Sequence, residues 1–319
     1  MTAPRLLPPK VKPIILGPAS EAVLLPAEAD LYARHQPWGF IVFARHCQNP
    51  DQLGQFCQDL RTAVGRPDAP ILIDQEGGRV QRLRPPHWPS HPPMASFGQQ
   101  YLAGDAVGAV RGLEQVANEQ AKMLLAAGIT VNCAPVMDLP IDGADPIIGD
   151  RAFGQDPALI ALLATVYAKA LLAAGVTPII KHLPGHGRAL VDSHLSLPVV
   201  DTPLDILQRT DFAPFRQLCQ DLAAEVAAGK IWGMTAHLLL TAVDGARPVS
   251  LSPTVIQQVI RQDIGFSGLL LSDDLEMKAL QGSYGDLAVQ ALSAGCDAVL
   301  LCNASIDQQR QTLEQLGCT

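Results

Sequence analysis

The sequence predicts an α/β fold, a single-domain (β/α)8 TIM barrel that spans residues 1–319. Eight short apolar runs recur along the chain, helical patterns separate most of them, and capping residues and glycines mark the helix boundaries. A doubly wound sheet is the main alternative, but it normally uses fewer strands. No linker, low-complexity tract or second domain interrupts the pattern.

The predicted strands are short and apolar throughout, which is typical of parallel strands covered on both faces. In chain order they are residues 14–16, 40–43, 71–73, 130–133, 178–180, 231–235, 269–271 and 298–301.

Caps and glycines predict the helix boundaries. A cap side-chain oxygen satisfies an unpaired amide, and proline in the first turn has no amide to leave unpaired. Four such starts are Asn49-Pro50, Asp156-Pro157, Thr202-Pro203 and Ser252-Pro253. Glycine ends a helix in the left-handed conformation, and the predicted ends are Gly65, Gly128, Gly175, Gly229, Gly265 and Gly295.

Spacings of three and four residues predict which helix faces are buried. One face comprises Val110, Leu113, Ala117, Ala121 and Leu124. A second comprises Leu159, Leu162, Val166, Ala170 and Ala173.

Composition excludes several classes of protein. Hydrophobic residues make up 48% of the chain, enough for a sizeable core, so the chain is not disordered. A net charge of −8 argues against nucleic acid or an anionic membrane surface as a partner. The segment Met1 to Lys10 lacks the apolar core of a signal peptide, and no run of eighteen apolar residues predicts a membrane span.

The seven cysteines are scattered and form no CxxC pair. This pattern favours reduced thiols in a cytoplasmic protein over a disulfide framework or a zinc site. Cys133, Cys296 and Cys302 lie in or beside predicted strands and are expected to be buried.

Polar residues follow four of the predicted strands. They are Asp74-Gln75-Glu76, the run from Lys181 to Gly187, Ala236-His237 and Ser272-Asp273-Asp274. The carboxyl ends of barrel strands converge on one mouth, where active sites are built. The sequence therefore predicts a polar pocket at that end of the barrel.

Three chemistries fit these groups. His182, His186, His194 and Asp192 suggest a metal site, but no strand carries a His-x-His pair and the histidines fall on a glycine-containing loop. A Schiff base on Lys181 would need a depressed pKa, whereas neighbouring acids should keep this lysine charged.

Glycoside hydrolysis is the third chemistry that these groups could perform. It needs a carboxylate near the anomeric carbon and a group that protonates the leaving oxygen. Asp273 or Asp274 can supply the carboxylate. Asp192 lies two residues from His194 and could hold that imidazole in its protonated form.

A series of motifs runs through the chain from residue 39 to residue 300. The densest are residues 74–82 (DQEGGRVQR), 134–138 (APVMD), 150–154 (DRAFG), 181–187 (KHLPGHG), 192–194 (DSH), 234–237 (MTAH) and 272–277 (SDDLEM). In these motifs the sequence resembles the bacterial β-N-acetylglucosaminidases of glycoside hydrolase family 3. The resemblance is to the cytosolic, single-domain enzymes that recycle peptidoglycan.

This resemblance implies a role for each matching residue. Asp273 corresponds to the nucleophile, His194 to the general acid and then base, and Asp192 to its partner. The residues that correspond to sugar-binding groups are Asp74, Arg82, Arg151, Lys181 and His182. The implied substrate is N-acetylglucosamine β-1,4-linked to anhydro-N-acetylmuramic acid, with or without its peptide. The implied mechanism is retaining, with no cofactor, metal or obligate protein partner.

Some alternatives stay open at this point. Asp274 could be the reactive carboxylate, and His186 and His237 are interpreted as structural histidines. An enzyme of this kind could transfer the sugar to phosphate instead of water. The chain could also be a catalytically silent sugar-binding barrel, although the presence together of Asp273, His194 and Asp192 argues against that.

Overall fold

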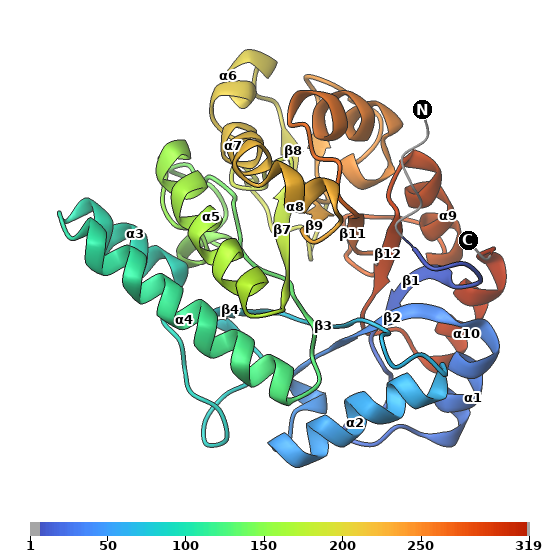
Figure 1. Ribbon diagram of the computed structural model, residues 1–319. Helices are drawn as coiled ribbons and strands as arrows, with labels where there is room; N and C mark the ends of the chain where they lie inside the picture. Colours follow the sequence, from blue (N-terminus) through green and yellow to red (C-terminus); the bar gives the residue numbers. More distant parts are fainter. Residues whose placement is uncertain (1–6, 318–319) are drawn as a thin grey trace.

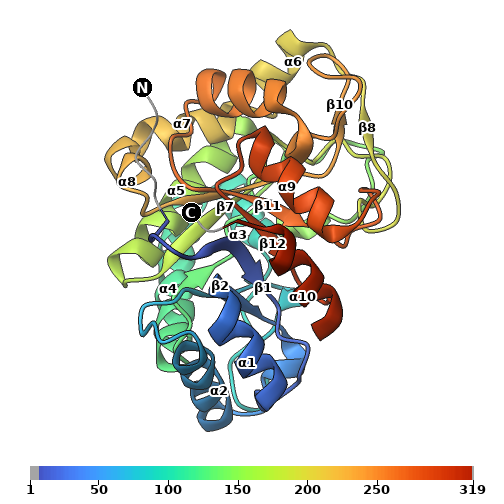
Figure 2. The same ribbon diagram turned by 90° about the vertical axis from the view of Figure 1, so that its right-hand side faces the viewer.

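The computed structural model describes residues 7–317 and contains a closed barrel of eight parallel strands (Figures 1 and 2). Residues 1–6, which belong to the segment expected to lack a signal peptide, and Cys318 lie outside the described residues. The barrel strands are β1 (Lys12–Leu16), β2 (Pro37–Val42), β3 (Ile71–Ile73), β6 (Val131–Asn132), β7 (Thr177–Leu183), β9 (Trp232–Thr235), β11 (Leu270–Asp274) and β12 (Ala298–Leu301).

All eight predicted strands are present, with ends shifted by up to three residues. The first strand pairs in parallel with both β2 and β12, so the sheet has no free edge. The predicted TIM barrel is thereby confirmed, and the doubly wound alternative is wrong because an open sheet leaves its edge strands unpaired.

Helices lie outside the ring of strands (Figure 1). They are α1 (Pro26–His35), α2 (Pro50–Ala63), α3 (Met94–Leu102), α4 (Ala106–Ala126), α5 (Pro157–Ala173), α6 (Leu204–Arg209), α7 (Ala213–Asp221), α8 (Ala223–Ala227), α9 (Tyr284–Ala294), α10 (Ile306–Gln315) and the π-helix η4 (Val255–Asp263). Short 3-10 turns occur at η1 (Ala44–His46), η2 (Gly149–Arg151) and η3 (Val249–Leu251). Among the described helices, none has both the length and the apolar character needed to cross a membrane.

Two small sheets lie outside the barrel and were not predicted. An antiparallel hairpin joins β4 (Gln75–Gly77) to β5 (Val80–Gln81). A parallel pair joins β8 (Val199–Val200) to β10 (Leu239–Leu240). Each sheet lies in segments that follow the C-terminal ends of barrel strands.

Three of the four predicted helix starts match the structure. The side chains of Asn49 and Asp156 accept hydrogen bonds from the first turns of α2 and α5. Ser252 Oγ accepts one from the amide of Val255, and Pro253 and Thr254 are α-helical and lead directly into η4. The start at Thr202-Pro203 is wrong by one residue. Pro203 is extended and its own carbonyl accepts the first helical hydrogen bond, so Thr202 lies outside α6.

All six predicted helix-ending glycines adopt positive φ angles, between 61° and 118°. The predicted buried face of α4 is also correct, because Leu113, Ala117, Ala121 and Leu124 are fully buried. The predicted face of α5 is wrong, since Leu162 is exposed. Most residues of α5 are apolar, so the three-and-four spacing fits several faces and cannot select one.

Successive residues of each barrel strand alternate between two apolar layers. Ile15, Ile41 and Leu72 point to the barrel interior, whereas Ile14 and Phe40 pack against the helices. The rings of Trp38 and Trp232, at the starts of β2 and β9, lie 4.6 Å apart and close the N-terminal end of the interior. The opposite end is therefore the one open to polar groups.

The six described cysteines are free thiols. Cys133, Cys296 and Cys302 are buried, as predicted.

Candidate active site

A cavity of about 370 Å³ lies at the C-terminal ends of the barrel strands. Its lining includes seven of the eight site residues predicted from the sequence, namely Asp74, Arg82, Arg151, Lys181, His182, His194 and Asp273. The eighth, Asp192, lies behind His194 and contacts its ring. The structure thus brings together side chains from β7, from β11, from the end of β3, and from three segments outside the strands, which carry Arg82, Arg151 and the pair of Asp192 and His194.

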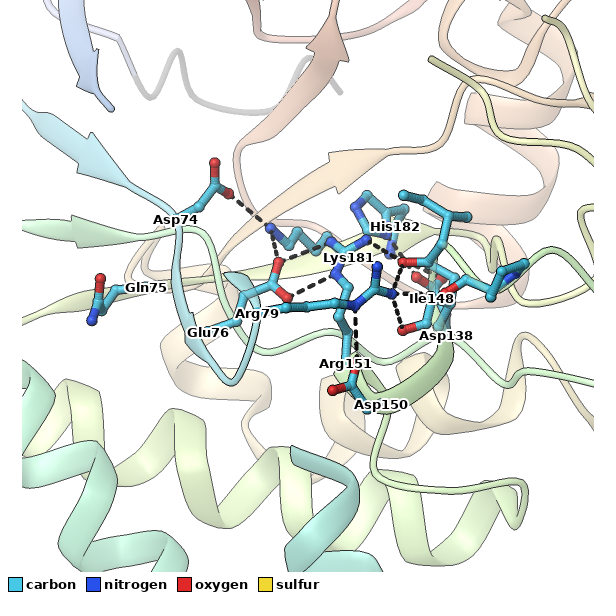
Figure 3. A network of polar contacts seen from close by, with 12 residues as sticks. Asp74, Gln75, Glu76, Arg79, Asp138, Ile148, Asp150, Arg151, Lys181 and His182 are labelled. Atoms are coloured by element: carbon cyan, nitrogen blue, oxygen red, sulfur yellow. Dashed lines mark hydrogen bonds and ion pairs between the residues drawn. The ribbon is translucent and has the colours of Figure 1, made fainter. Parts of the chain in front are cut away.

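Lys181, at the end of β7, is the centre of a buried ionic network (Figure 3). Its Nζ lies 2.9 Å from Asp74 Oδ1 and 2.7 Å from Glu76 Oε1. Arg82 donates to the second oxygen of Asp74 at 3.0 Å. Arg151 donates from Nε and Nη2 to both oxygens of Glu76, at 2.8 and 2.9 Å. Each of these five side chains is fixed by an oppositely charged neighbour.

The network determines the charge of its members. Burial lowers the pKa of Lys181, but Asp74 and Glu76 outweigh burial and hold that pKa well above its ordinary value. Burial raises the pKa of Glu76, but Arg151 and Lys181 lower it to about 2. Lys181 therefore remains an ammonium ion, which disfavours Schiff-base chemistry at this position.

Glu76 was not among the site residues predicted from the sequence. A usable signal exists, since Glu76 follows Asp74 by two residues and side chains at that spacing share a face of an extended chain. Its partner Arg151 is 75 residues away, however, and no local pattern links the two.

Asp138 is a second buried acid that was quoted in a motif but given no role. Its Oδ2 lies 2.6 Å from His182 Nδ1, and its Oδ1 accepts from the backbone amides of His182 and His186. Burial raises the pKa of Asp138, but His182 outweighs it and lowers the pKa to about 2. Asp138 fixes the His182 ring through one nitrogen, which leaves the other for the cavity.

Asp273 and Asp274 end β11 and differ in pKa. Burial raises the pKa of Asp273, but His182, His237 and the amide of Asp274 together hold it below its ordinary value. Burial, reinforced by Glu276, raises the pKa of Asp274 to about 7. Since a nucleophilic carboxylate must be ionised, this difference favours Asp273 over Asp274.

His237 is buried beside the backbone of Asp274. Its Nδ1 lies 2.6 Å from Ser250 Oγ, and its Nε2 lies 3.0 Å from the backbone oxygen of Asp274. Both ring nitrogens therefore have partners within the protein, which supports its interpretation as a structural histidine.

The loop after β7 carries the pair formed by Asp192 and His194. Their Oδ1 and Nδ1 atoms lie 2.7 Å apart, and the same oxygen accepts from the His194 amide at 2.8 Å. Burial raises the pKa of Asp192, but the hydrogen bonds from His194 lower it overall. The His194 side chain is 60% exposed, so its ring can reach a molecule in the cavity.

Metal binding by the loop histidines has no support in the geometry. Within residues 7–317, His, Cys, Asp and Glu side chains form no group of three placed to hold a metal ion. His182, His186 and His194 instead contact three separate partners, which are Asp138, Ser193 and Asp192.

Comparison with known proteins identifies the family. The model of the glycosyl hydrolase family 3 N terminal domain matches residues 26–317. A β-hexosaminidase of Methylobacillus flagellatus is 38% identical over 272 residues, which cover 83% of this chain and 73% of that protein. A β-hexosaminidase of Bordetella avium is 34% identical over 318 residues, which cover 99% of this chain and 87% of that protein.

Solved structures agree with the sequence relatives. Native NagZ from Neisseria gonorrhoeae superposes with a TM-score of 0.86 and 33% sequence identity. The superposition covers 98% of this chain and 87% of that one. The chain therefore belongs to glycosyl hydrolase family 3 and is a glycoside hydrolase.

Proposed function

We propose that this glycoside hydrolase is a retaining exo-β-N-acetylglucosaminidase with Asp273 as nucleophile and His194 as general acid and base. One observation carries the proposal. Asp273, whose pKa is held low, and His194, whose ring is paired with Asp192, line the same cavity. A carboxylate and a proton donor that face one sugar are the two groups that glycoside hydrolysis requires.

In the first step the Asp273 carboxylate attacks the anomeric carbon of the bound sugar. The bond from that carbon to the leaving oxygen breaks, and His194 Nε2 gives its proton to this oxygen. The products are a glycosyl ester on Asp273 and a free aglycone alcohol. Asp192 stabilises the imidazolium before transfer and orients the ring through Nδ1.

In the second step water attacks the anomeric carbon of the ester. His194 Nε2 takes a proton from the water, the ester bond breaks, and Asp273 leaves as a carboxylate. Two displacements at the same carbon retain its configuration.

The ionic network supplies the proposed sugar-binding groups. Asp74, Arg82, Arg151, Lys181 and His182 present both charged donors and charged acceptors to the cavity. Hydroxyl groups can donate and accept, so such a mixed set suits a neutral sugar. The relatives named β-hexosaminidase support an N-acetylhexosamine as the sugar that binds in this cavity.

The same proposal includes a specific substrate, which we infer from the resemblance of the sequence motifs to the family. It is N-acetylglucosamine β-1,4-linked to anhydro-N-acetylmuramic acid, released during peptidoglycan recycling by a single-domain enzyme in the cytoplasm. The free buried thiols support a reducing compartment.

Trapping with a 5-fluoro N-acetylglucosaminyl fluoride tests the nucleophile. Tandem mass spectrometry of the digested enzyme should locate the label on Asp273. An Asp274→Asn variant should still be labelled, and an Asp273→Asn variant should not. A label on Asp274, or on a residue outside the cavity, would overturn the assignment.

Turnover of an aryl N-acetylglucosaminide with and without phosphate tests the acceptor. Hydrolysis predicts free N-acetylglucosamine in both reactions. Formation of the sugar 1-phosphate in the phosphate reaction would show a phosphorylase instead.

A further inference from the structure

Ser193 is a buried residue in an otherwise exposed stretch of the loop that carries His194. Leu190 and Leu195 are each 66% exposed, whereas Ser193 is only 3% exposed. Because Ser193 lies between Asp192 and His194 in the sequence, whatever holds it also fixes the position of both.

Two contacts hold Ser193. Its Oγ lies 3.1 Å from Nε2 of His186, which is itself buried. Its backbone oxygen accepts from the amide of Ala279 at 3.2 Å. The first contact comes from the start of the same loop, and the second comes from the segment after β11.

The start of the loop is fixed to the barrel. A side chain at Gly187 would place its Cβ 2.0 Å from the backbone oxygen of Leu139, so the two backbones are in close contact. Arg188 donates to Asp211 at 2.7 Å, and the Ala189 oxygen accepts from the amide of Asp145 at 2.8 Å. Beyond Ala189 the chain becomes exposed, and Ser193 is its next buried residue.

His186 is well placed to hold Ser193. Its amide donates to Asp138 Oδ1 at 2.7 Å, and the same carboxylate binds the ring of His182. Burial lowers the pKa of His186 to about 4, so its ring is neutral near neutral pH. A neutral imidazole can pair with a hydroxyl in either tautomer, because Nε2 either donates or accepts.

We infer that the hydrogen bond between His186 and Ser193 positions His194 over the cavity, so that these two are positioning residues for the general acid. The inference rests on the proposed function. It links the groups that bind the sugar to the group that protonates its leaving oxygen, through Asp138 and His186. Neither positioning residue takes part in bond making.

A Ser193→Ala variant should lose the hydroxyl and leave the rest of the loop unchanged. His194 would then occupy the protonating position less often. For an aryl N-acetylglucosaminide with a poor leaving group, kcat/KM should fall by about tenfold to a hundredfold. For one with an activated leaving group, which needs no acid, kcat/KM should stay within about twofold.

Two controls separate positioning from loss of structure. Ser193→Thr keeps the hydroxyl and should restore most of the lost rate. Ser196→Ala removes an exposed hydroxyl from the same loop and should leave kcat/KM unchanged for both substrates. A double variant that combines His186→Ala with Ser193→Ala should be no slower than His186→Ala alone, because each substitution removes the same hydrogen bond.

The outcomes are distinct. Equal losses on both substrates, or no loss on either, would overturn the inference, as would additive losses in the double variant. A wild-type enzyme that hydrolyses neither N-acetylglucosaminide would overturn the proposed function instead.

Discussion

At the scale of single residues, His194 is an unusual residue to propose as the general acid, because most glycosidases use two carboxylates. Asp274 shows what happens to a second acid in this cavity. Burial, reinforced by the neighbouring carboxylates of Glu276 and Asp273, raises the pKa of Asp274 to about 7. A carboxylate at the position of His194 would place another anion near Asp273 and oppose its ionisation. An imidazole adds no negative charge in either protonation state.

A His194→Gly variant tests this role. For an aryl N-acetylglucosaminide with an activated leaving group, we expect the first step to proceed and a burst of aryl alcohol to appear. For a poor leaving group the rate should fall by about a hundredfold to ten-thousandfold, because the leaving oxygen then lacks a proton donor. Stopped-flow and steady-state rates on both substrates measure this. Equal losses on the two would contradict the assigned role.

At the scale of elements, local chemistry predicted most of the barrel. The six helix-ending glycines and the caps Asn49 and Asp156 act within one turn of chain, so a single sequence reveals them. The burial of α5 and the π-helical form of η4 were not predictable in this way. The first depends on which of several apolar faces meets the barrel, and the second on how the chain packs after Ser252-Pro253.

Two helical glycines should respond oppositely to alanine. At Gly54 in α2 an added Cβ meets nothing within 4 Å. Gly54→Ala should therefore stabilise the folded protein by about 0.5–1 kcal/mol, because alanine restricts the unfolded chain and favours a helix more than glycine does. At Gly98 in α3 the Cβ would lie 1.7 Å from the backbone oxygen of Phe153. Gly98→Ala should therefore destabilise by roughly 1–3 kcal/mol.

Thermal unfolding of the two variants measures this contrast, and each serves as the control for the other. Phe153 lies two residues after Arg151, one of the proposed sugar-binding residues, so Gly98→Ala should also weaken sugar binding and raise KM. A Gly98→Ala variant as stable as the wild type would show that α3 can move away without cost.

At the scale of the whole molecule, the sequence predicted where the candidate site lies, but it did not predict which of its side chains pair with one another. Strand ends identified the mouth, and the resemblance assigned Asp273, His194 and Lys181. The pairs of Glu76 with Arg151 and of Asp138 with His182 span 75 and 44 residues and form only when the barrel closes. Such pairing depends on strand order and register, which a single sequence does not display.

Buried carboxylates should make the fold sensitive to acid. Asp138 has an ordinary pKa of 3.8 and a folded pKa of about 2. Its contribution is complete above the ordinary pKa and is lost as the pH falls from about 4 to about 2, amounting to roughly 2 kcal/mol. Asp274 acts in the opposite sense, because a pKa raised to about 7 removes stability as the pH rises towards neutrality.

An Asp138→Asn variant tests this contribution. It should be less stable than the wild type at about pH 6 and should lose less stability on acidification to about pH 2. Urea unfolding at both pH values measures the difference, with Asp307→Asn, at an exposed carboxylate, as the control. An unchanged pH dependence would show that Asp138 does not contribute to acid sensitivity.

The ionic network around Lys181, which we propose binds the sugar, also influences the entropy of binding. Its long side chains are held by one another, so their rotational freedom is already lost in the folded protein. Ordering such a side chain during binding costs about 0.5–1.5 kcal/mol. A sugar that enters therefore meets a preorganised receptor, and the remaining entropy loss falls on the sugar itself and on the loop that carries His194.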